Sequence, residues 1–233
     1  MAKGKKYTAT LEKFSVDTLY SAEDALKMLK ELAYANFDET VELNFNLGID
    51  PRQAEQVIRG TMTLPNGSGK EMRVVVVCQE KDFDAVKEAG ALEVGADDLI
   101  EKINKGWFGF DIMIASPDMM SKVGRLGKAL GGRGLMPNPK SGTVTPDVAK
   151  AVKEFKSGKF EYRNDKTGIV HFVIGKVSFE LGQLLENMQA VFDEIQKIKP
   201  QKTKGTYIKS LVLSSTMSPG IKVNPDLVSV KEL

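Results

Sequence analysis

Two different patterns of hydrophobic residues divide this chain and limit the folds open to it. Over residues 40–49, apolar and polar residues alternate strictly. The apolar positions are Val41, Leu43, Phe45, Leu47 and Ile49. Such alternation predicts a strand with one face in water. Over residues 72–79 the chain instead reads MRVVVVCQ, a continuous apolar run typical of a strand buried on both faces of a parallel sheet. The chain therefore contains two different kinds of sheet.

The buried strand at 72–79 opens a block in which strands and helices alternate. A second buried strand is predicted at 110–117. Helical spacing marks the segments 82–91, 97–106, 118–130 and 145–158. Strands and helices that alternate at this spacing predict a three-layer α/β unit of the Rossmann-like kind.

The segments on either side of this block follow an α+β pattern. Before the block, strands with one buried face and one face in water are predicted at 40–49 and 56–65. After the block, two strands joined around NDKTG are predicted at 159–176. An amphipathic helix at 181–198 and a strand at 206–216 complete the chain. We predict a discontinuous α+β domain of residues 1–67 and 160–233, with an α/β domain of residues 68–159 inserted in it.

Composition excludes several classes of protein. No apolar run approaches the roughly 18 residues of a membrane span, and the N-terminal MAKGKKYTAT lacks the apolar core of a signal peptide. The single cysteine, Cys78, permits neither an internal disulfide nor a multi-cysteine metal site. We expect a cytoplasmic protein without a metal or cofactor.

The loop LGGRGLMPNPKSG at residues 130–142 is rich in glycine, as nucleotide-binding loops are, so we compare this region with the known nucleotide-binding motifs. Just before the loop, Gly127 and Lys128 do not complete a phosphate-binding motif, because Ala129 stands where a hydroxyl should bind magnesium. Within the loop, Gly132 and Gly134 do not complete a dinucleotide fingerprint, because Pro137 replaces its third glycine. His171, the only histidine, has no catalytic partner nearby in sequence. The acid pair Asp38–Glu39 is interpreted as a solvated turn. A nucleotide-dependent α/β enzyme is the less favoured alternative to a non-enzymatic binding protein.

The same loop lies in the most one-sided charge patch of the chain. Residues 119–146 contain no Asp or Glu. Their basic residues are Lys122, Arg125, Lys128, Arg133 and Lys140. This basic patch favours a polyanionic partner. A structural loop that closes the α/β domain remains the alternative for LGGRGLMPNPKSG.

Four segments carry a family resemblance: FDETVELNFNLGIDPR, LGGRGLMPNPKSGTV, YRNDKTG and SSTMSPGIKVN. Together they resemble the bacterial family of large-subunit ribosomal protein one, over nearly the whole chain. The resemblance implies a structural, non-enzymatic protein of the ribosome's mobile stalk, which binds large-subunit (23S) ribosomal RNA and assists release of deacylated tRNA from the exit site. It also implies a translational repressor that binds the messenger RNA of its own operon.

The resemblance implies RNA-binding residues in the discontinuous domain. They are Phe37, Thr40, Glu42, Asn44, Arg52, Arg163, Lys166, Ser210, Thr216, Met217 and Ser218. It offers the basic patch as a secondary contact with RNA or exit-site tRNA. From the residues alone, core packing of Phe37 and an ordinary strand end at Thr216 and Met217 stay open. The chain departs from the family pattern at Asn36, Asn46, Gly132 and Ser218, and a serine at the last position is expected to fit the backbone less easily than glycine.

Overall fold

The computed structural model describes residues 4–201, 203 and 205–228 and has a mixed α/β structure with several sheets and helices. Its contacts divide the chain into a terminal unit, Met1–Gly69 with Tyr162–Leu233, and an inserted unit, Lys70–Glu161. The unit boundaries fall at Gly69 and Glu161, whereas the sequence predicts domain boundaries at residues 67 and 159. No helix in the described ranges is long and apolar enough to cross a membrane.

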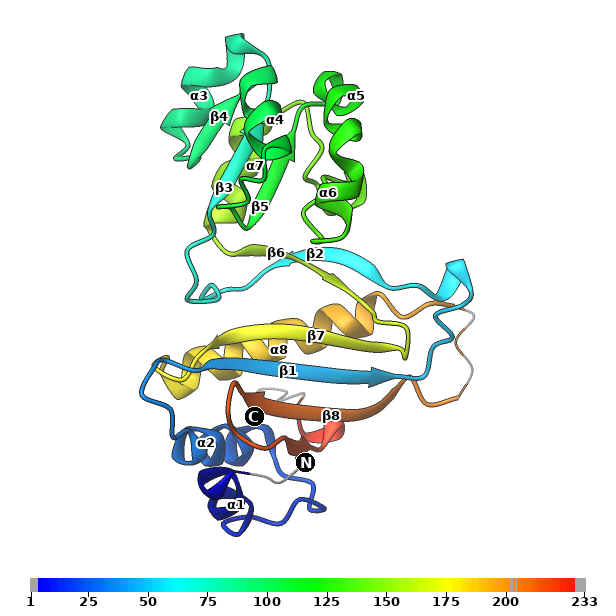
Figure 1. Cartoon of the computed structure of the whole chain (residues 1–233). Coiled ribbons are helices and arrows are strands. Elements are labelled where there is room, and N and C mark those ends of the chain that lie inside the picture. The colour runs from blue at the N-terminus through cyan, green and yellow to red at the C-terminus, as the bar shows by residue number, and fades with distance from the viewer. Residues whose placement is uncertain (1–3, 202, 204, 229–233) are drawn as a thin grey trace. The chain divides into compact units, whose positions relative to one another are not determined.

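A four-stranded sheet forms the centre of the terminal unit (Figure 1). The strands are β1 (Thr40–Leu47), β7 (Ile169–Lys176), β8 (Ile208–Ser215) and β9 (Ile221–Val223). Their order is β7-β1-β8-β9, and every pair is antiparallel. Buried and half-buried residues alternate along β1, which confirms the predicted two-faced strand.

The helices α2 (Ala22–Leu32) and α8 (Leu181–Lys197) pack on this sheet and on each other. The ring of Phe45 on β1 lies 5.7 Å from Phe172 and 6.4 Å from Phe192 of α8, measured between centroids. All three rings are buried, and aromatic side chains bury more apolar surface per residue than most others. A shorter helix, α1 (Lys5–Leu11), precedes α2.

Strand pairing differs from the prediction at β6 (Lys159–Arg163). The prediction joins this strand to β7 around NDKTG, but β6 forms a two-stranded sheet with β2 (Arg59–Thr63). Among the described residues, an isolated bridge between Asn164 and Val170 is the only ladder pairing between the two predicted partners, although the rings of Tyr162 and Phe172 lie 5.0 Å apart between centroids. Asn164 is buried and accepts a hydrogen bond from the backbone N–H of Ile58 (2.8 Å), which draws the chain toward β2.

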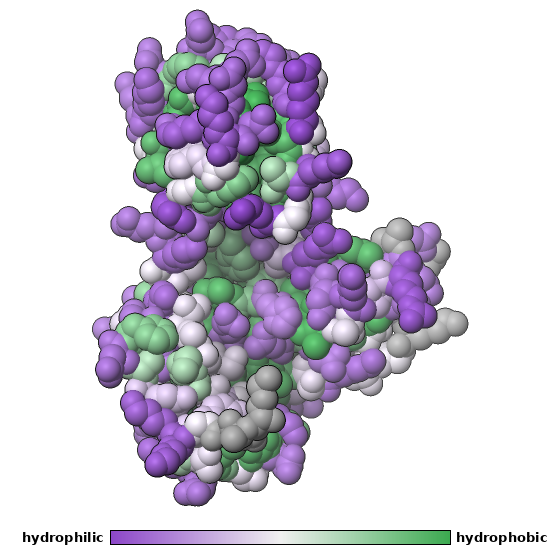
Figure 2. All heavy atoms as spheres, viewed as in Figure 1, coloured by the Kyte–Doolittle hydropathy of each residue, from purple (hydrophilic) through white to green (hydrophobic). Residues whose placement is uncertain are grey.

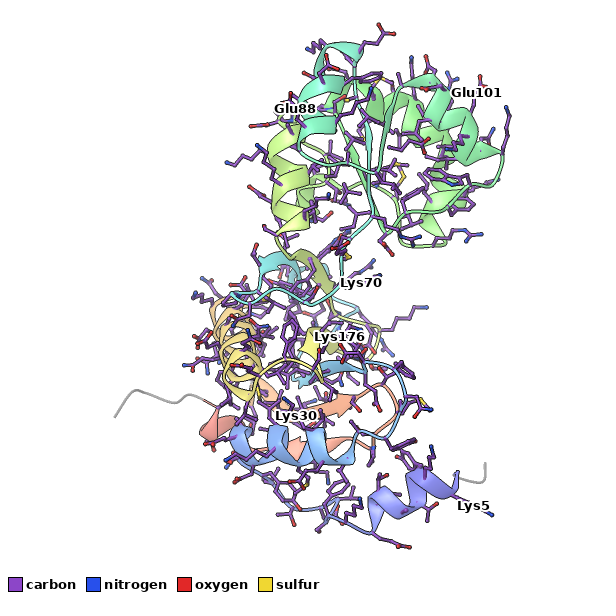
Figure 3. The ribbon with its side chains drawn as sticks, turned by 90° about the vertical axis from the view of Figure 1, so that its left-hand side faces the viewer. Lys5, Lys30, Lys70, Glu88, Glu101 and Lys176 are labelled. Carbon is purple, nitrogen blue, oxygen red and sulfur yellow. The ribbon has the colours of Figure 1, made fainter. Side chains whose placement is uncertain are left out.

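Three parallel strands form the sheet of the inserted unit. In the order β4-β3-β5 they are Glu93–Gly95, Val74–Val77 and Ile112–Ala115. Val75 and Val77 face one core with α4 (Asp97–Asn104), and Val74 and Val76 face the other with α3 (Phe83–Glu88) and α7 (Val148–Lys156). Glu88 on α3 and Glu101 on α4 mark these two sides in Figure 3. The buried β3 confirms the predicted continuous apolar strand.

The segment 118–130 is helical as predicted, but it is not one continuous α-helix. Residues 117–131 form four consecutive short helices: η3 (Pro117–Met119), α5 (Met120–Val123), η4 (Gly124–Leu126) and α6 (Gly127–Gly131). Gly124 and Gly127 each begin a new turn, and glycine costs about 1 kcal/mol relative to alanine inside a helix. The apolar spacing survives these breaks, because Val123, Leu126 and Leu130 are all buried.

Candidate nucleic-acid interface

The predicted RNA-binding residues fall into three groups on the terminal unit. A strand-end cluster lies where β1 begins and β8 ends, and its members are Phe37, Thr40, Thr216, Met217 and Ser218. A polar strand face continues from it along β1 and β8, with Glu42, Asn44 and Ser210. The third group is basic and exposed: Arg52 follows β1, Arg163 ends β6 and Lys166 lies in the turn before β7.

The polar strand face is built by cross-strand pairs. Glu42 lies opposite Ser214, and Asn46 lies opposite Ser210. Asn44 donates from Nδ2 to the Ser214 hydroxyl at 3.3 Å and accepts from Nδ1 of His171 at 2.6 Å. His171 therefore belongs to this face, although the predicted site omits it. Its position directly opposite Asn44 depends on strand register, which a lone histidine in the sequence does not reveal.

The exposed fractions of the Phe37 and Met217 side chains show whether these residues pack in the core or lie at the surface. Phe37 is 57% exposed and Met217 is 44% exposed. Core packing, the alternative for Phe37, is therefore wrong, and Met217 likewise lies at the surface, just beyond the end of β8. Large apolar side chains that lie this open beside polar residues are typical of contact surfaces.

Hydrogen bonds hold the strand-end cluster together. The backbone N–H of Thr40 donates to the Thr216 hydroxyl at 3.0 Å, and Nζ of Lys176 donates to the Thr40 hydroxyl at 2.8 Å. Lys176, labelled in Figure 3, comes from the neighbouring strand β7. The Ser218 hydroxyl accepts from the backbone N–H of Ser215 at 2.9 Å. The cluster thus joins three strands before any ligand is present.

Ser218 does not carry the expected backbone strain. No non-glycine residue among those described has a positive φ, so this position does not require the conformation that favours glycine. Gly132, the other departure in a loop, has φ −65°, a value that proline also adopts. Neither departure distorts the described backbone.

Glu39 contradicts the interpretation of Asp38–Glu39 as a solvated turn. It is only 2% exposed, and its carboxylate accepts from the backbone N–H groups of Tyr34, Ala35 and Met217 and from the Ser215 hydroxyl. Burial raises the pKa of the Glu39 carboxyl, but these hydrogen bonds outweigh burial and lower it below its ordinary value. An ionised carboxylate therefore lies beneath the strand-end cluster. In the sequence, only the polar residues next to Glu39 could have indicated this role.

The basic patch lies in the inserted unit, whose visible surface is largely hydrophilic in Figure 2. Its five cations are exposed. Nζ of Lys122 lies 2.7 Å from an oxygen of Asp97, and the Arg133 guanidinium lies 4.0 Å from the centroid of Phe108. These exposed pairs leave the patch available to an anionic surface.

The second half of the loop LGGRGLMPNPKSG is held by its own polar side chains. The Asn138 side chain accepts from the N–H of Lys140 at 2.8 Å, and the buried Ser141 hydroxyl donates to the Asn138 carbonyl at 3.0 Å. The Thr143 hydroxyl accepts from the Asn138 N–H at 2.8 Å, and Val144 forms a parallel bridge with Ala115 of β5. Residues 138–144 therefore close the edge of the sheet, as the structural interpretation of this loop predicts.

Comparison with known proteins identifies the family. The sequence model of the ribosomal protein L1p/L10e family matches residues 29–219. The "Large ribosomal subunit protein uL1" of Lactobacillus delbrueckii subsp. bulgaricus is 53% identical over 222 residues, which cover 95% of this chain and 96% of the relative, in each of two strains, ATCC BAA-365 and ATCC 11842. The alternative of a nucleotide-dependent enzyme is therefore wrong. The chain belongs to the ribosomal protein L1p/L10e family, a family of structural ribosomal proteins and not of enzymes.

Proposed function

We propose that the chain binds a structured region of 23S ribosomal RNA in the mobile stalk of the large ribosomal subunit, in the cytoplasm, through its terminal unit. The observation that carries this proposal is the exposure of Phe37 and Met217 at one end of a polar strand face. Hydroxyl, amide and carboxylate groups of that face suit the 2′-OH groups and base edges of folded RNA. The exposed apolar side chains suit stacking and packing against bases.

The net charge of the terminal part of the chain supports an RNA contact that depends on shape and hydrogen bonding. Residues 1–67 and 160–233 together contain 18 Lys or Arg and 18 Asp or Glu, so this part of the chain is electrically neutral. A neutral protein surface gains little from the release of counterions, which dominates binding to bare phosphate. Arg52, Arg163 and Lys166 are exposed and supply local phosphate contacts. The proposed interface therefore depends more on hydrogen bonds than on net charge.

We further propose that the two units are separate domains with different roles. The terminal domain, residues 1–67 and 160–233 in the sequence prediction, holds the ribosomal RNA. The inserted Rossmann-like domain, residues 68–159, presents the basic patch to the deacylated tRNA of the exit site and assists its release. Five exposed cations in a stretch without acids support an electrostatic and easily reversed contact of this kind.

A regulatory role uses the same site. A messenger RNA that reproduces the fold of the ribosomal RNA site would occupy the strand-end cluster and the polar strand face when ribosomal RNA is saturated. The chain would then repress translation of its own operon. Competition between the two RNAs for one surface supports this proposal, because no second site is needed.

The test is binding of the purified full chain to a transcribed fragment of the 23S stalk RNA, compared with an unrelated duplex of equal length. We expect at least about a hundredfold preference for the stalk fragment at physiological salt. The operon leader RNA should compete with the fragment, and Phe37→Ala should weaken both complexes. Equal affinity for the fragment and the unrelated duplex would overturn the proposal. A leader RNA that binds without displacing the fragment would overturn the shared site.

A further inference from the structure

Glu39 is a buried carboxylate that joins two loops from opposite ends of the sequence. Its Oε1 accepts from the backbone N–H groups of Tyr34 at 3.2 Å and Ala35 at 2.9 Å. Its Oε2 accepts from the backbone N–H of Met217 at 3.0 Å and from the Ser215 hydroxyl. An isolated buried carboxylate is very costly, but each oxygen here has two donors. The bonds therefore persist only while both loops keep their places.

Each of the two loops carries one of the exposed apolar side chains. Phe37 follows the Tyr34–Ala35 backbone, and Met217 is itself bonded to the carboxylate. The Tyr34 hydroxyl also donates to the carbonyl of Met217 at 3.0 Å, so the loops are tied to each other as well. The backbone segments that carry Phe37 and Met217 are thus held together by the hydrogen bonds of Glu39 and Tyr34.

We infer that Glu39 is a positioning residue of the RNA site, which presents Phe37 and Met217 at a fixed spacing without itself touching RNA. This inference rests on the proposed function. Ordering a flexible loop on binding consumes part of the interaction energy, and a preorganised surface avoids that loss. A neutral interface depends strongly on such fit because long-range attraction does not compensate for misplaced contacts.

Glu39→Gln is the decisive variant, and Asp38→Asn is its matched control. The glutamine amide has nearly the size of the carboxylate, but its NH₂ group faces backbone N–H donors in place of one oxygen. One loop therefore loses its acceptor. Asp38 is the adjacent acid and is exposed, and its carboxylate accepts hydrogen bonds from the N–H and the hydroxyl of Ser178. Both variants remove one negative charge, and only the first reaches the buried network.

The first readout needs no RNA. In the free full-length protein labelled with ¹³C-methyl methionine, Glu39→Gln should shift and broaden the Met217 methyl signal, assigned with Met217→Ala. Asp38→Asn should leave that signal in place. An unchanged Met217 signal in Glu39→Gln would overturn the positioning role. If Glu39→Gln does not fold, Ser215→Ala removes one donor, keeps the charge, and must move the same signal in the same way.

The second readout is RNA affinity in a double-mutant cycle. Glu39→Gln should weaken binding of the stalk fragment at least about tenfold in the wild-type background and less than about threefold in Met217→Ala, because the spacing that Glu39 fixes has no further effect once the Met217 side chain is removed. Equal losses in both backgrounds would show a general loss of stability and overturn this inference alone. No loss of affinity in Met217→Ala itself would instead overturn the proposed RNA site. Ser215→Ala serves in the same cycle with a smaller expected effect.

Discussion

The hydroxyl of Thr216 accepts a hydrogen bond from the backbone N–H of Thr40, with 3.0 Å between oxygen and nitrogen. This bond connects the end of β8 to the start of β1 across 176 positions of sequence. The Thr216 hydroxyl proton is not used by that bond and can still be donated outward. Thr216 can therefore support the strand-end cluster and contact a ligand at the same time.

Thr216→Val should weaken binding of the stalk RNA at least tenfold, with an unchanged dependence on salt. Valine keeps the shape of threonine but leaves the Thr40 N–H and an RNA group without a partner, at a cost of about 1–3 kcal/mol. Filter binding over a series of salt concentrations measures both quantities. Thr216→Ser, which keeps the hydroxyl, should retain most of the affinity.

Lys128→Ala supplies the electrostatic comparison. Lys128 belongs to the basic patch of the inserted unit, so its loss should change the affinity for ribosomal RNA little. Equal losses from Thr216→Val and Lys128→Ala, or a steep salt dependence without any effect of Thr216→Val, would show that phosphate contacts dominate binding.

Removal of the inserted unit should leave ribosomal RNA binding largely intact. We expect a chain with residues 70–161 replaced by a short Gly/Ser linker to bind the stalk fragment within about tenfold of the full chain, since the proposed RNA-binding groups lie outside that range. Circular dichroism must first show that the shortened chain is folded. A folded terminal unit with most of its affinity lost would make the inserted unit a primary contact.

Asp111 should protect the inserted unit against acid. Hydrogen bonds from Arg73 (Nε–Oδ2 2.9 Å) and, after the opposing effect of burial, from Lys70 (Nζ–Oδ1 3.0 Å) hold the pKa of the Asp111 carboxyl well below its usual range. A lowered pKa means that this stability is present above the ordinary value of about 4 and is lost as the pH falls through the lower pKa of the folded state.

Asp111→Asn should therefore lower the free energy of unfolding of the inserted unit by about 1–3 kcal/mol at pH 7. The difference from wild type should shrink steadily from about pH 4 downward. Urea unfolding followed by the fluorescence of Trp107, the only tryptophan, reports on this unit. A difference that stays constant down to pH 2 would contradict the role of the Asp111 charge.

Cys78 should react with a thiol reagent only when the inserted unit opens. Its side chain is fully buried, and burial, with a smaller effect of Asp82, raises the pKa of the thiol to about 11. The reactive thiolate is therefore scarce at pH 8, and the reagent has no access to it. We expect labelling by a disulfide reagent at pH 8 to be at least about a hundredfold slower in the native protein than in 6 M urea. Rapid labelling of the native protein would show that this core is open.

The sequence by itself determined the elements in which apolar residues follow a regular pattern. The alternation through Val41, Leu43 and Phe45 predicted a two-faced strand, and the run of valines predicted a strand buried on both faces. Both predictions hold because the period of the side chains depends only on backbone geometry within one element.

Tertiary structure decided how distant segments meet. The burial of Glu39, its bonds to Ser215 and Met217, and the pairing of β6 with β2 have no periodic signal, because each depends on a partner far away in the chain. The exposure of Phe37 has the same origin, since an apolar side chain is buried only where another element covers it. Residue types and spacing therefore indicated which segments form the candidate site. Only the fold, by closing the loops around one buried carboxylate, decided which of their side chains face the solvent.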